Sequence, residues 1–158
     1  MSFHEIYERH HAALFRYLHR YTGDADLAED LVHEAFVRLL GADVPESEAR
    51  PWLFKVATNL VRDDARRASR HARLAVEAAG FVAPRESAEE RLQRAAAVNR
   101  VRAALDALDD RERRMLLMRE EGFAYREIAQ AVDVAAGSVG TLLARALQKF
   151  RRAYEEGA

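Results

Sequence analysis

Residues 122–139, GFAYREIAQAVDVAAGSV, predict a short helix, a tight turn and a second helix. Ile128 and Ala129 fall on the inward side of the first helix, and Val139 follows ten residues after Ala129, with Leu142 three further on. This spacing packs two helices at a steep angle through a turn of three to four residues. The stretch therefore predicts the helix-turn-helix geometry that many proteins use to read DNA.

The same stretch departs from a DNA-reading motif at three positions. Asp133 occupies the turn position where glycine is usual, and the second helix carries Gly140 and Leu142 where basic residues are expected. Gly140 inside a helix costs on the order of 1 kcal/mol relative to alanine. Whether the unit still reads DNA is left open by the sequence.

Composition predicts an all-α protein. The chain has 158 residues, of which 49% are hydrophobic and 32% charged, with three prolines and seven glycines. It lacks cysteine, which excludes disulfides and thiolate metal sites within this chain. We expect no signal peptide and no membrane insertion, and we expect a cytoplasmic protein.

The net charge of −1 conceals an uneven distribution. Residues 62–73 and 145–152 are basic, whereas 24–34 and 86–90 are acidic. Local basic patches on a neutral chain suit contact with nucleic acid at one place and with another protein elsewhere.

Hydrophobic periodicity predicts two small helical domains joined by a flexible linker. The first domain covers residues 1–73, the linker 74–87 and the second domain 88–158. The first four expected helices cover residues 3–21, 25–40, 51–73 and 88–108. Asp109 or Asp110 caps a fifth helix, which Gly122 ends. The first helix of the helix-turn-helix follows, and the last helix covers residues 137–155.

Three segments, in this order, carry a resemblance to a known family. DADLAEDLVHEAFVRLL (residues 24–40), PWLFKVATNLVRDDARR (51–67) and the stretch that begins LDALDDRERRMLLMREEG at residue 105 are similar to motifs of extracytoplasmic-function (ECF) RNA polymerase sigma factors. The resemblance implies a bacterial initiation factor that binds core RNA polymerase, directs it to specific promoters and opens DNA at the −10 element. It also implies a nucleoid association when bound to polymerase and an anti-sigma factor as a further partner.

The resemblance places core polymerase binding on the helix 24–40. The implied docking residues are Asp24, Asp30, Leu31, Glu34 and Arg38. Asp30, Glu34 and Arg38 share one helix face at intervals of four residues. The alternative to a docking surface is that this face is only a solvated charged surface, in which Glu34 and Arg38 pair with each other.

The resemblance places −10 recognition on the third helix. Asn59 can form paired hydrogen bonds with a base edge, while arginines neutralise phosphates. The 41–50 loop before the helix could accept a flipped base. Trp52 has an alternative role as a core residue rather than a base-stacking one. The arginines have an alternative role in keeping the end of the helix soluble rather than binding phosphates. The implied residues are Trp52, Lys55, Asn59, Arg62, Asp63, Arg66 and Arg67.

The last helix is expected to contact the upstream −35 element. In the preferred register Val134, Gly137, Val139 and Leu143 match the family pattern, and an alternative register would need an insertion in the turn. The few polar and basic side chains that remain predict phosphate anchoring with weakened or altered sequence readout. The implied −35 contacts are Arg126, Ser138, Thr141, Arg145 and Lys149.

We expect no cofactor, no metal site and no enzymatic activity. His33-Glu34 begins like a zinc-protease motif, but Val37 occupies the second histidine position. Two functions remain open: a promoter-opening initiation factor, and a sigma-like regulator or interaction protein that binds a protein partner with weakened DNA readout.

Overall fold

The first two helices begin and end at local capping signals. The structure is a computed structural model that describes residues 2–63 and 87–157. Helix α1 spans Phe3–Thr22 and α2 spans Ala25–Leu40. Gly23 ends α1 in the left-handed region (φ 75°), and the Asp24 side chain accepts the Leu27 N–H at 3.1 Å to start α2. The predicted bounds of both helices are confirmed to within one residue.

The third helix starts earlier than the sequence suggested. A short 3₁₀ helix, η1 (Glu46–Glu48), leads directly into α3 (Ala49–Asp63). Pro51 lies in the first turn of α3, where its missing N–H has no helical acceptor to lose. The predicted continuation to Arg73, and linker residues 74–86, lie outside the described residues.

Four helices follow residue 87, and two of them carry complete capping boxes. Ser87 and Glu90 cap α5, and Asp109 and Glu112 cap α6, so Asp109 rather than Asp110 is the cap. The helices are α5 (Ala88–Asp106), α6 (Asp110–Glu120), α7 (Tyr125–Val132) and α8 (Val139–Glu156), with a 3₁₀ turn η2 (Ala136–Ser138) before α8. The last helix therefore begins two residues later than predicted.

The helix α5 differs from the others in its exposure. Residues 88–99 are all exposed, and only Ala104 and Leu105 of this helix are buried. Its C-terminal end packs against α8, where Arg100 lies over the Tyr154 ring at 3.9 Å.

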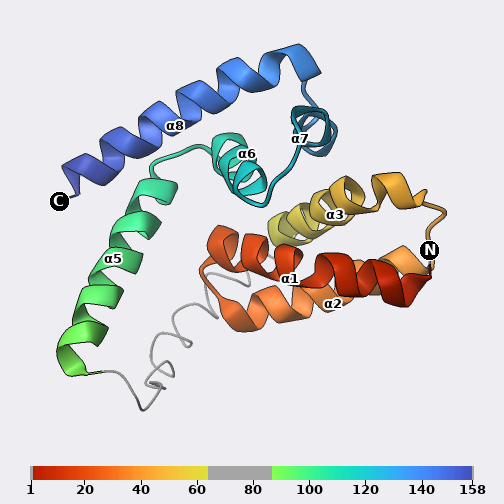
Figure 1. The fold of residues 1–158 in the computed structure, drawn as a ribbon, viewed down its shortest axis with the longest axis horizontal. Coiled ribbons are helices and arrows are strands. Elements are labelled where there is room, and N and C mark those ends of the chain that lie inside the picture. Colours follow the sequence, from red (N-terminus) through yellow and green to blue (C-terminus); the bar gives the residue numbers. More distant parts are fainter. Residues whose placement is uncertain (1, 64–86, 158) are drawn as a thin grey trace.

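The helices form two units that pack on each other. We call residues 2–63 (α1, α2, η1 and α3) the N-terminal unit and residues 87–157 (α5 to α8) the C-terminal unit. In Figure 1, α6 and α7 lie between α8 and the N-terminal helices, and contacts join α1 to α6 and α3 to α7. A single cluster of buried apolar residues runs through both units. The all-α prediction is confirmed, and the close packing of the units is a finding that the sequence did not predict.

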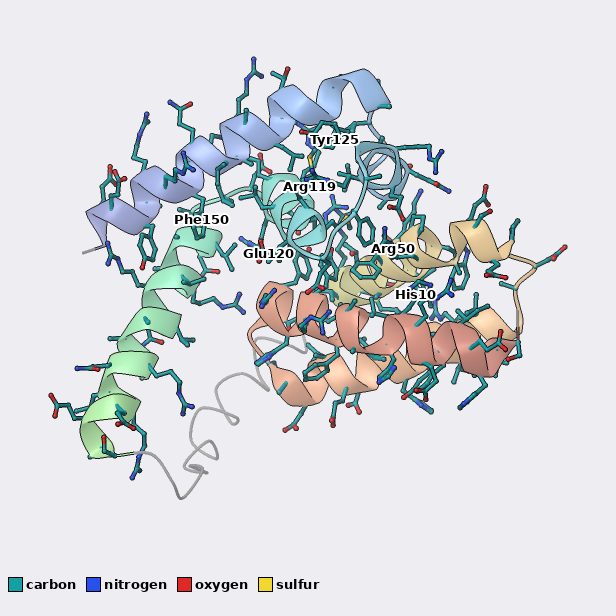
Figure 2. The ribbon with its side chains drawn as sticks, in the orientation of Figure 1. His10, Arg50, Arg119, Glu120, Tyr125 and Phe150 are labelled. Carbon is teal, nitrogen blue, oxygen red and sulfur yellow. The ribbon has the colours of Figure 1, made fainter. Side chains whose placement is uncertain are left out.

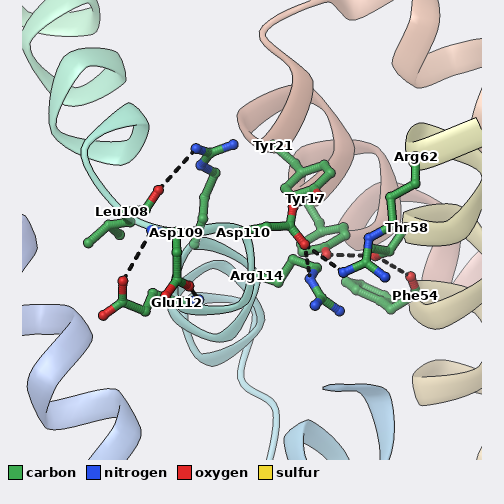
Figure 3. Close-up of polar contacts among 11 residues, drawn as sticks. Tyr17, Tyr21, Phe54, Thr58, Arg62, Leu108, Asp109, Asp110, Glu112 and Arg114 are labelled. Carbon is green, nitrogen blue, oxygen red and sulfur yellow. Dashed lines mark hydrogen bonds and ion pairs between the residues drawn. The ribbon is translucent and has the colours of Figure 1, made fainter. Parts of the chain in front are cut away.

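The centre of the N-terminal unit holds a buried pair of hydroxyls. The Tyr17 hydroxyl lies 2.8 Å from Thr58 Oγ1, and Thr58 in turn donates to the Phe54 carbonyl at 2.7 Å (Figure 3). Since the Thr58 hydrogen is used for Phe54, Tyr17 donates to Thr58. Burial, opposed by this hydrogen bond, raises the pKa of Tyr17. The pair ties α1 to α3 and fixes which face of α3 points outward.

Among the described helices, none combines the length and the apolar character that a membrane crossing requires.

Candidate nucleic-acid and protein interfaces

The predicted docking face of α2 is exposed and carries acidic and basic side chains. Asp30 is exposed, and Arg38 Nε donates to Glu34 Oε1 at 3.2 Å, with about half of each side chain accessible. The internal pair expected from the i, i+4 spacing is therefore present. It holds the two side chains in a defined position on the helix surface.

Two of the five predicted docking residues have structural roles in the free chain. Leu31 is only 4% exposed and belongs to the hydrophobic core, so its assignment to the docking face is corrected. Asp24 is half-buried and uses its carboxylate as the N-cap of α2. The exposed face thus reduces to Asp30, Glu34 and Arg38.

The outer face of α3 presents an amide between two cations. Lys55, Asn59 and Arg62 are spaced at i, i+4 and i+7, so they share one side of the helix. Asn59 and Arg62 are exposed, whereas Trp52 is partly buried and packs against the core, as its alternative interpretation expected. Asp63 is exposed at the end of α3, and Arg66 and Arg67 lie outside the described residues.

Both cations of this face are paired with carboxylates of the C-terminal unit. Lys55 Nζ lies 2.8 Å from Asp133 Oδ1, and Arg62 lies 2.7 Å from Asp110 Oδ2. The hydrogen bond to Asp110 raises the pKa of Arg62. Burial acts to raise the pKa of Asp110, but hydrogen bonds from Tyr21 and Arg62 and the charge of Arg114 outweigh it and lower the pKa (Figure 3).

A third pair joins the units nearer the start of α3, and no local sequence pattern predicted it. Arg50, labelled in Figure 2, binds both carboxylate oxygens of Glu127 in α7, with Nε 2.8 Å from Oε2. The Arg50 guanidinium also lies 4.5 Å from the centre of the Phe123 ring. Burial raises the pKa of Glu127, but hydrogen bonds from Arg50 and from the Ala124 N–H overcome this effect and lower it. The charge of Glu127 is thus stabilised by the partner unit.

The helix-turn-helix is formed by α7, η2 and α8. Asp133 ends α7 in the left-handed conformation (φ 57°, ψ 50°), which aspartate tolerates better than most residues. Ile128, Ala129 and Val139 are buried, as the spacing predicted. The motif is therefore complete in backbone geometry despite its unusual turn residue.

The predicted −35 residues lie mainly on the surface. Lys149 is exposed but paired, because its Nζ lies 2.9 Å from Glu112 Oε2 of α6. The same glutamate accepts the Asp109 N–H in the capping box of α6. The other exposed members are Arg126, Ser138, Thr141 and Arg145.

The start of α8 lacks side-chain support. No side chain caps it, neither from Ser138 nor from the residue before η2, and Asp133 is engaged with Lys55. A Cβ at Gly140 would lie 3.5 Å from the Tyr125 ring, an ordinary contact distance. Leu142 is partly buried and packs against the core, so it faces inward rather than toward a ligand.

Two family matches fall on the two units. Residues 6–71 match the family described as Sigma-70 region 2, and residues 99–150 match Sigma-70, region 4. The first match covers the α2 and α3 faces, and the second covers the helix-turn-helix.

Whole-chain relatives carry the same family name. The chain is 33% identical to the ECF RNA polymerase sigma factor SigL of Mycobacterium tuberculosis, over 96% of this chain and 88% of that protein. It is 26% identical to the ECF sigma factor SigM of Bacillus subtilis, over 99% and 98% of the two chains. The fold resembles the sigma factor RpoE of Bartonella quintana, solved in complex with the anti-sigma factor NepR, with a TM-score of 0.65, 18% identity and coverage of 97% and 96%. The chain therefore belongs to the ECF family of RNA polymerase sigma factors, which bind core RNA polymerase and direct it to promoters.

Proposed function

We propose that the α2 face of Asp30, Glu34 and Arg38 docks on core RNA polymerase, and that the outer face of α3 engages the −10 element. The observation that carries the proposal is the placement of Asn59 on the same side of α3 as Lys55 and Arg62. An amide can form two hydrogen bonds with one base edge, while a cation about one turn away on each side contacts the flanking phosphates.

We assign the remaining roles to the family regions. Residues 1–73 would serve polymerase docking and −10 opening, 74–87 the linker, and 88–158 the upstream contact. Arg126, Thr141 and Arg145 supply phosphate contacts to the −35 element, whereas Gly140 and Leu142 offer no polar base contact. Upstream readout is therefore weaker than −10 recognition.

We also propose a protein inhibitor as a further partner, on the basis of the Bartonella quintana relative that was solved with its anti-sigma factor. The role is non-enzymatic and cytoplasmic, with nucleoid association through polymerase. The second candidate function is a sigma-like interaction protein with weakened DNA readout. It is favoured by the pairing of Lys55 and Arg62 with carboxylates of the same chain.

Reconstituted transcription separates the two functions. Overexpression of the chain in cells, followed by transcript mapping, identifies a responsive promoter. Core polymerase is then incubated with the purified chain and this promoter. Core binding, promoter opening and run-off transcripts are measured separately. Promoter-dependent transcripts support the initiation factor. Core binding without any transcript supports the interaction protein.

Matched variants test the residue assignments. Asp30→Asn should weaken core binding, whereas Glu29→Gln removes the same charge from another side of α2 and should not. Asn59→Ala should leave core binding intact and reduce promoter opening by roughly 5- to 150-fold, the loss of one good base contact. Asn99→Ala, an exposed asparagine in α5, is its control. Equal effects of Asn59→Ala and Asn99→Ala would contradict the assignment of Asn59.

A further inference from the structure

The outer face of α8 continues beyond the residues already assigned to upstream DNA. Its exposed side chains follow one another at intervals of three or four residues and therefore form one strip along the helix: Thr141, Ala144, Arg145, Gln148 and Arg152. The buried residues of α8 lie on the opposite side of the helix. In Figure 1, α8 runs along one edge of the molecule, and α5, α6 and α7 all lie on its other side.

The beginning of this strip holds few groups that read a base. Gly140 has no side chain, Leu142 packs against the core, and the 3₁₀ turn before α8 consists of an alanine, a glycine and Ser138. Small residues let the helix backbone approach DNA closely, but they carry no side chain with two hydrogen-bonding groups. The first turn of α8 therefore fits against DNA without distinguishing the base pairs.

We propose that Gln148, in the third turn of α8, reads one base pair of the upstream element and selects adenine, with α8 lying along the major groove. The proposal rests on the −35 role assigned to α8 above. It adds the side chain that carries the sequence preference, and it places that preference in the third turn of the helix instead of the first.

The chemistry of Gln148 and its neighbours fits this role. A glutamine amide both donates and accepts a hydrogen bond, which matches the amino group and N7 of adenine in the major groove. Arg145 lies three residues before Gln148 and Arg152 four residues after it, so a cation stands about one turn away on each side. Within the described part of the chain, no hydrogen bond or ion pair engages these three side chains. Asn59 of α3 has the same arrangement, but there both cations are already paired with carboxylates.

The surface around Gln148 is hollowed and basic. A shallow hollow of about 420 Å³ is lined by Ala144, Leu147, Gln148, Arg151, Arg152 and Glu155. Because Ala144 is small and lies one turn before Gln148, a base edge has room beside the amide. Three arginines, Arg145, Arg151 and Arg152, stand against the single carboxylate of Glu155, and this excess of positive charge favours a polyanion along the strip.

The spacing of the strip suits a helix that lies along the groove. Counted from Thr141, the next three exposed residues follow at three, four and seven positions, the intervals with which the recognition helix of a homeodomain contacts DNA. Seven helical residues advance by roughly 10 Å, which is about three base pairs of DNA. Gln148 therefore lies about three base pairs from the pair nearest to Thr141.

Selection from a library of upstream sequences tests the assignment. The responsive promoter is randomised over its upstream element, and the complex of the chain with core polymerase selects from this library. We expect a preference for A·T at one base pair of about 5- to 150-fold, the discrimination of one bidentate contact. Gln148→Ala should abolish this preference and leave the other positions unchanged. Gln93→Ala, at an exposed glutamine of α5, is the matched control and should change nothing.

A second variant turns the loss of preference into a change of preference. A carboxylate only accepts hydrogen bonds, so Gln148→Glu should move the preference at the same base pair from A·T to C·G, whose cytosine amino group donates. Arg152→Ala should instead weaken binding to all sequences alike and lower the salt dependence by about one phosphate contact.

The outcomes separate this proposal from the proposed function. A wild-type complex without an upstream preference for A·T, or a preference that Gln148→Ala leaves unchanged, would overturn the proposal. A complex that selects no promoter at all contradicts the proposed function instead. The free chain is then tested on fully randomised duplex DNA, where a preference for A·T that depends on Gln148 supports the proposal and its absence overturns it.

Discussion

Truncation of Phe123 tests whether the two units form one cooperative structure. The ring is fully buried, although it belongs to the connection between α6 and α7. Its aromatic and cation contacts are both with α3: an edge contact with Phe54 at 4.6 Å and the guanidinium of Arg50 at 4.5 Å. Phe123→Ala therefore removes stabilisation mainly from the interface between the units.

The size of the effect follows from the contacts. Burial of a phenylalanine side chain contributes about 1.5–3 kcal/mol, the aromatic pair about 0.5–1.5 kcal/mol and the partly buried cation contact about 0.5–2 kcal/mol. These contributions agree with the loss of about 3–5 kcal/mol that is typical of Phe→Ala in a core. Such a loss shifts the equilibrium between chains whose units are packed together and chains whose units are separated by roughly two to four powers of ten.

Urea unfolding with two probes measures this loss. The single tryptophan, Trp52 in α3, reports the N-terminal unit, and far-ultraviolet circular dichroism reports the helices of both units. We expect coincident transitions in the wild type and separated transitions in Phe123→Ala. Leu92→Ala, at a side chain that is 72% exposed, should change the free energy of unfolding by less than about 0.5 kcal/mol. Coincident transitions in Phe123→Ala, with a loss below about 1 kcal/mol, would refute the reasoning.

Further predictions concern single contacts within each unit. Thr58→Val should reduce the free energy of unfolding by about 1–3 kcal/mol, because it leaves the buried Tyr17 hydroxyl without an acceptor. Tyr17→Phe should cost only about 0.5–1.5 kcal/mol, because Thr58 keeps its hydrogen bond to the Phe54 carbonyl. Equal losses of the two variants in urea unfolding would contradict this prediction. Gly140→Ala should raise the stability by about 1 kcal/mol in thermal unfolding, since the new methyl meets Tyr125 at contact distance; a loss would show that the glycine relieves a clash. Because the folded pKa of Glu127 lies below its ordinary 4.5, its contribution to stability is present above pH 4.5 and is lost as the pH falls through the lowered value. Glu127→Gln should flatten that part of the pH profile, and an unchanged slope would place the acid sensitivity elsewhere.

The sequence predicted the individual helices well because their signals are local. Asp24, Gly23 and Asp109 mark helix ends by capping chemistry, and the helix-turn-helix spacing placed Ile128 and Val139 in the core. Pro51 lies in the first turn of α3 as predicted, but the helix begins two residues before it, at Ala49, because the preceding 3₁₀ turn continues directly into the helix.

The candidate sites were predicted less completely, because their geometry depends on contacts between distant residues. Leu31 shares the charged segment of α2 but faces inward. Lys55 and Arg62 were expected to bind phosphate, and nothing in their local pattern predicted partners 78 and 48 residues away. Only Asp133 gave a signal, as an aspartate in a place where glycine is usual.

The exposed part of α5 makes the reach of the C-terminal unit adjustable. Residues 88–99 bury no side chain, and helices of this length are marginal in water when packing does not support them. A helical residue advances the chain by about 1.5 Å and an extended one by up to about 3.3–3.6 Å. Melting these turns would thus lengthen the connection to α6 by roughly 20 Å, so a change of temperature or a bound partner changes the distance that this segment spans.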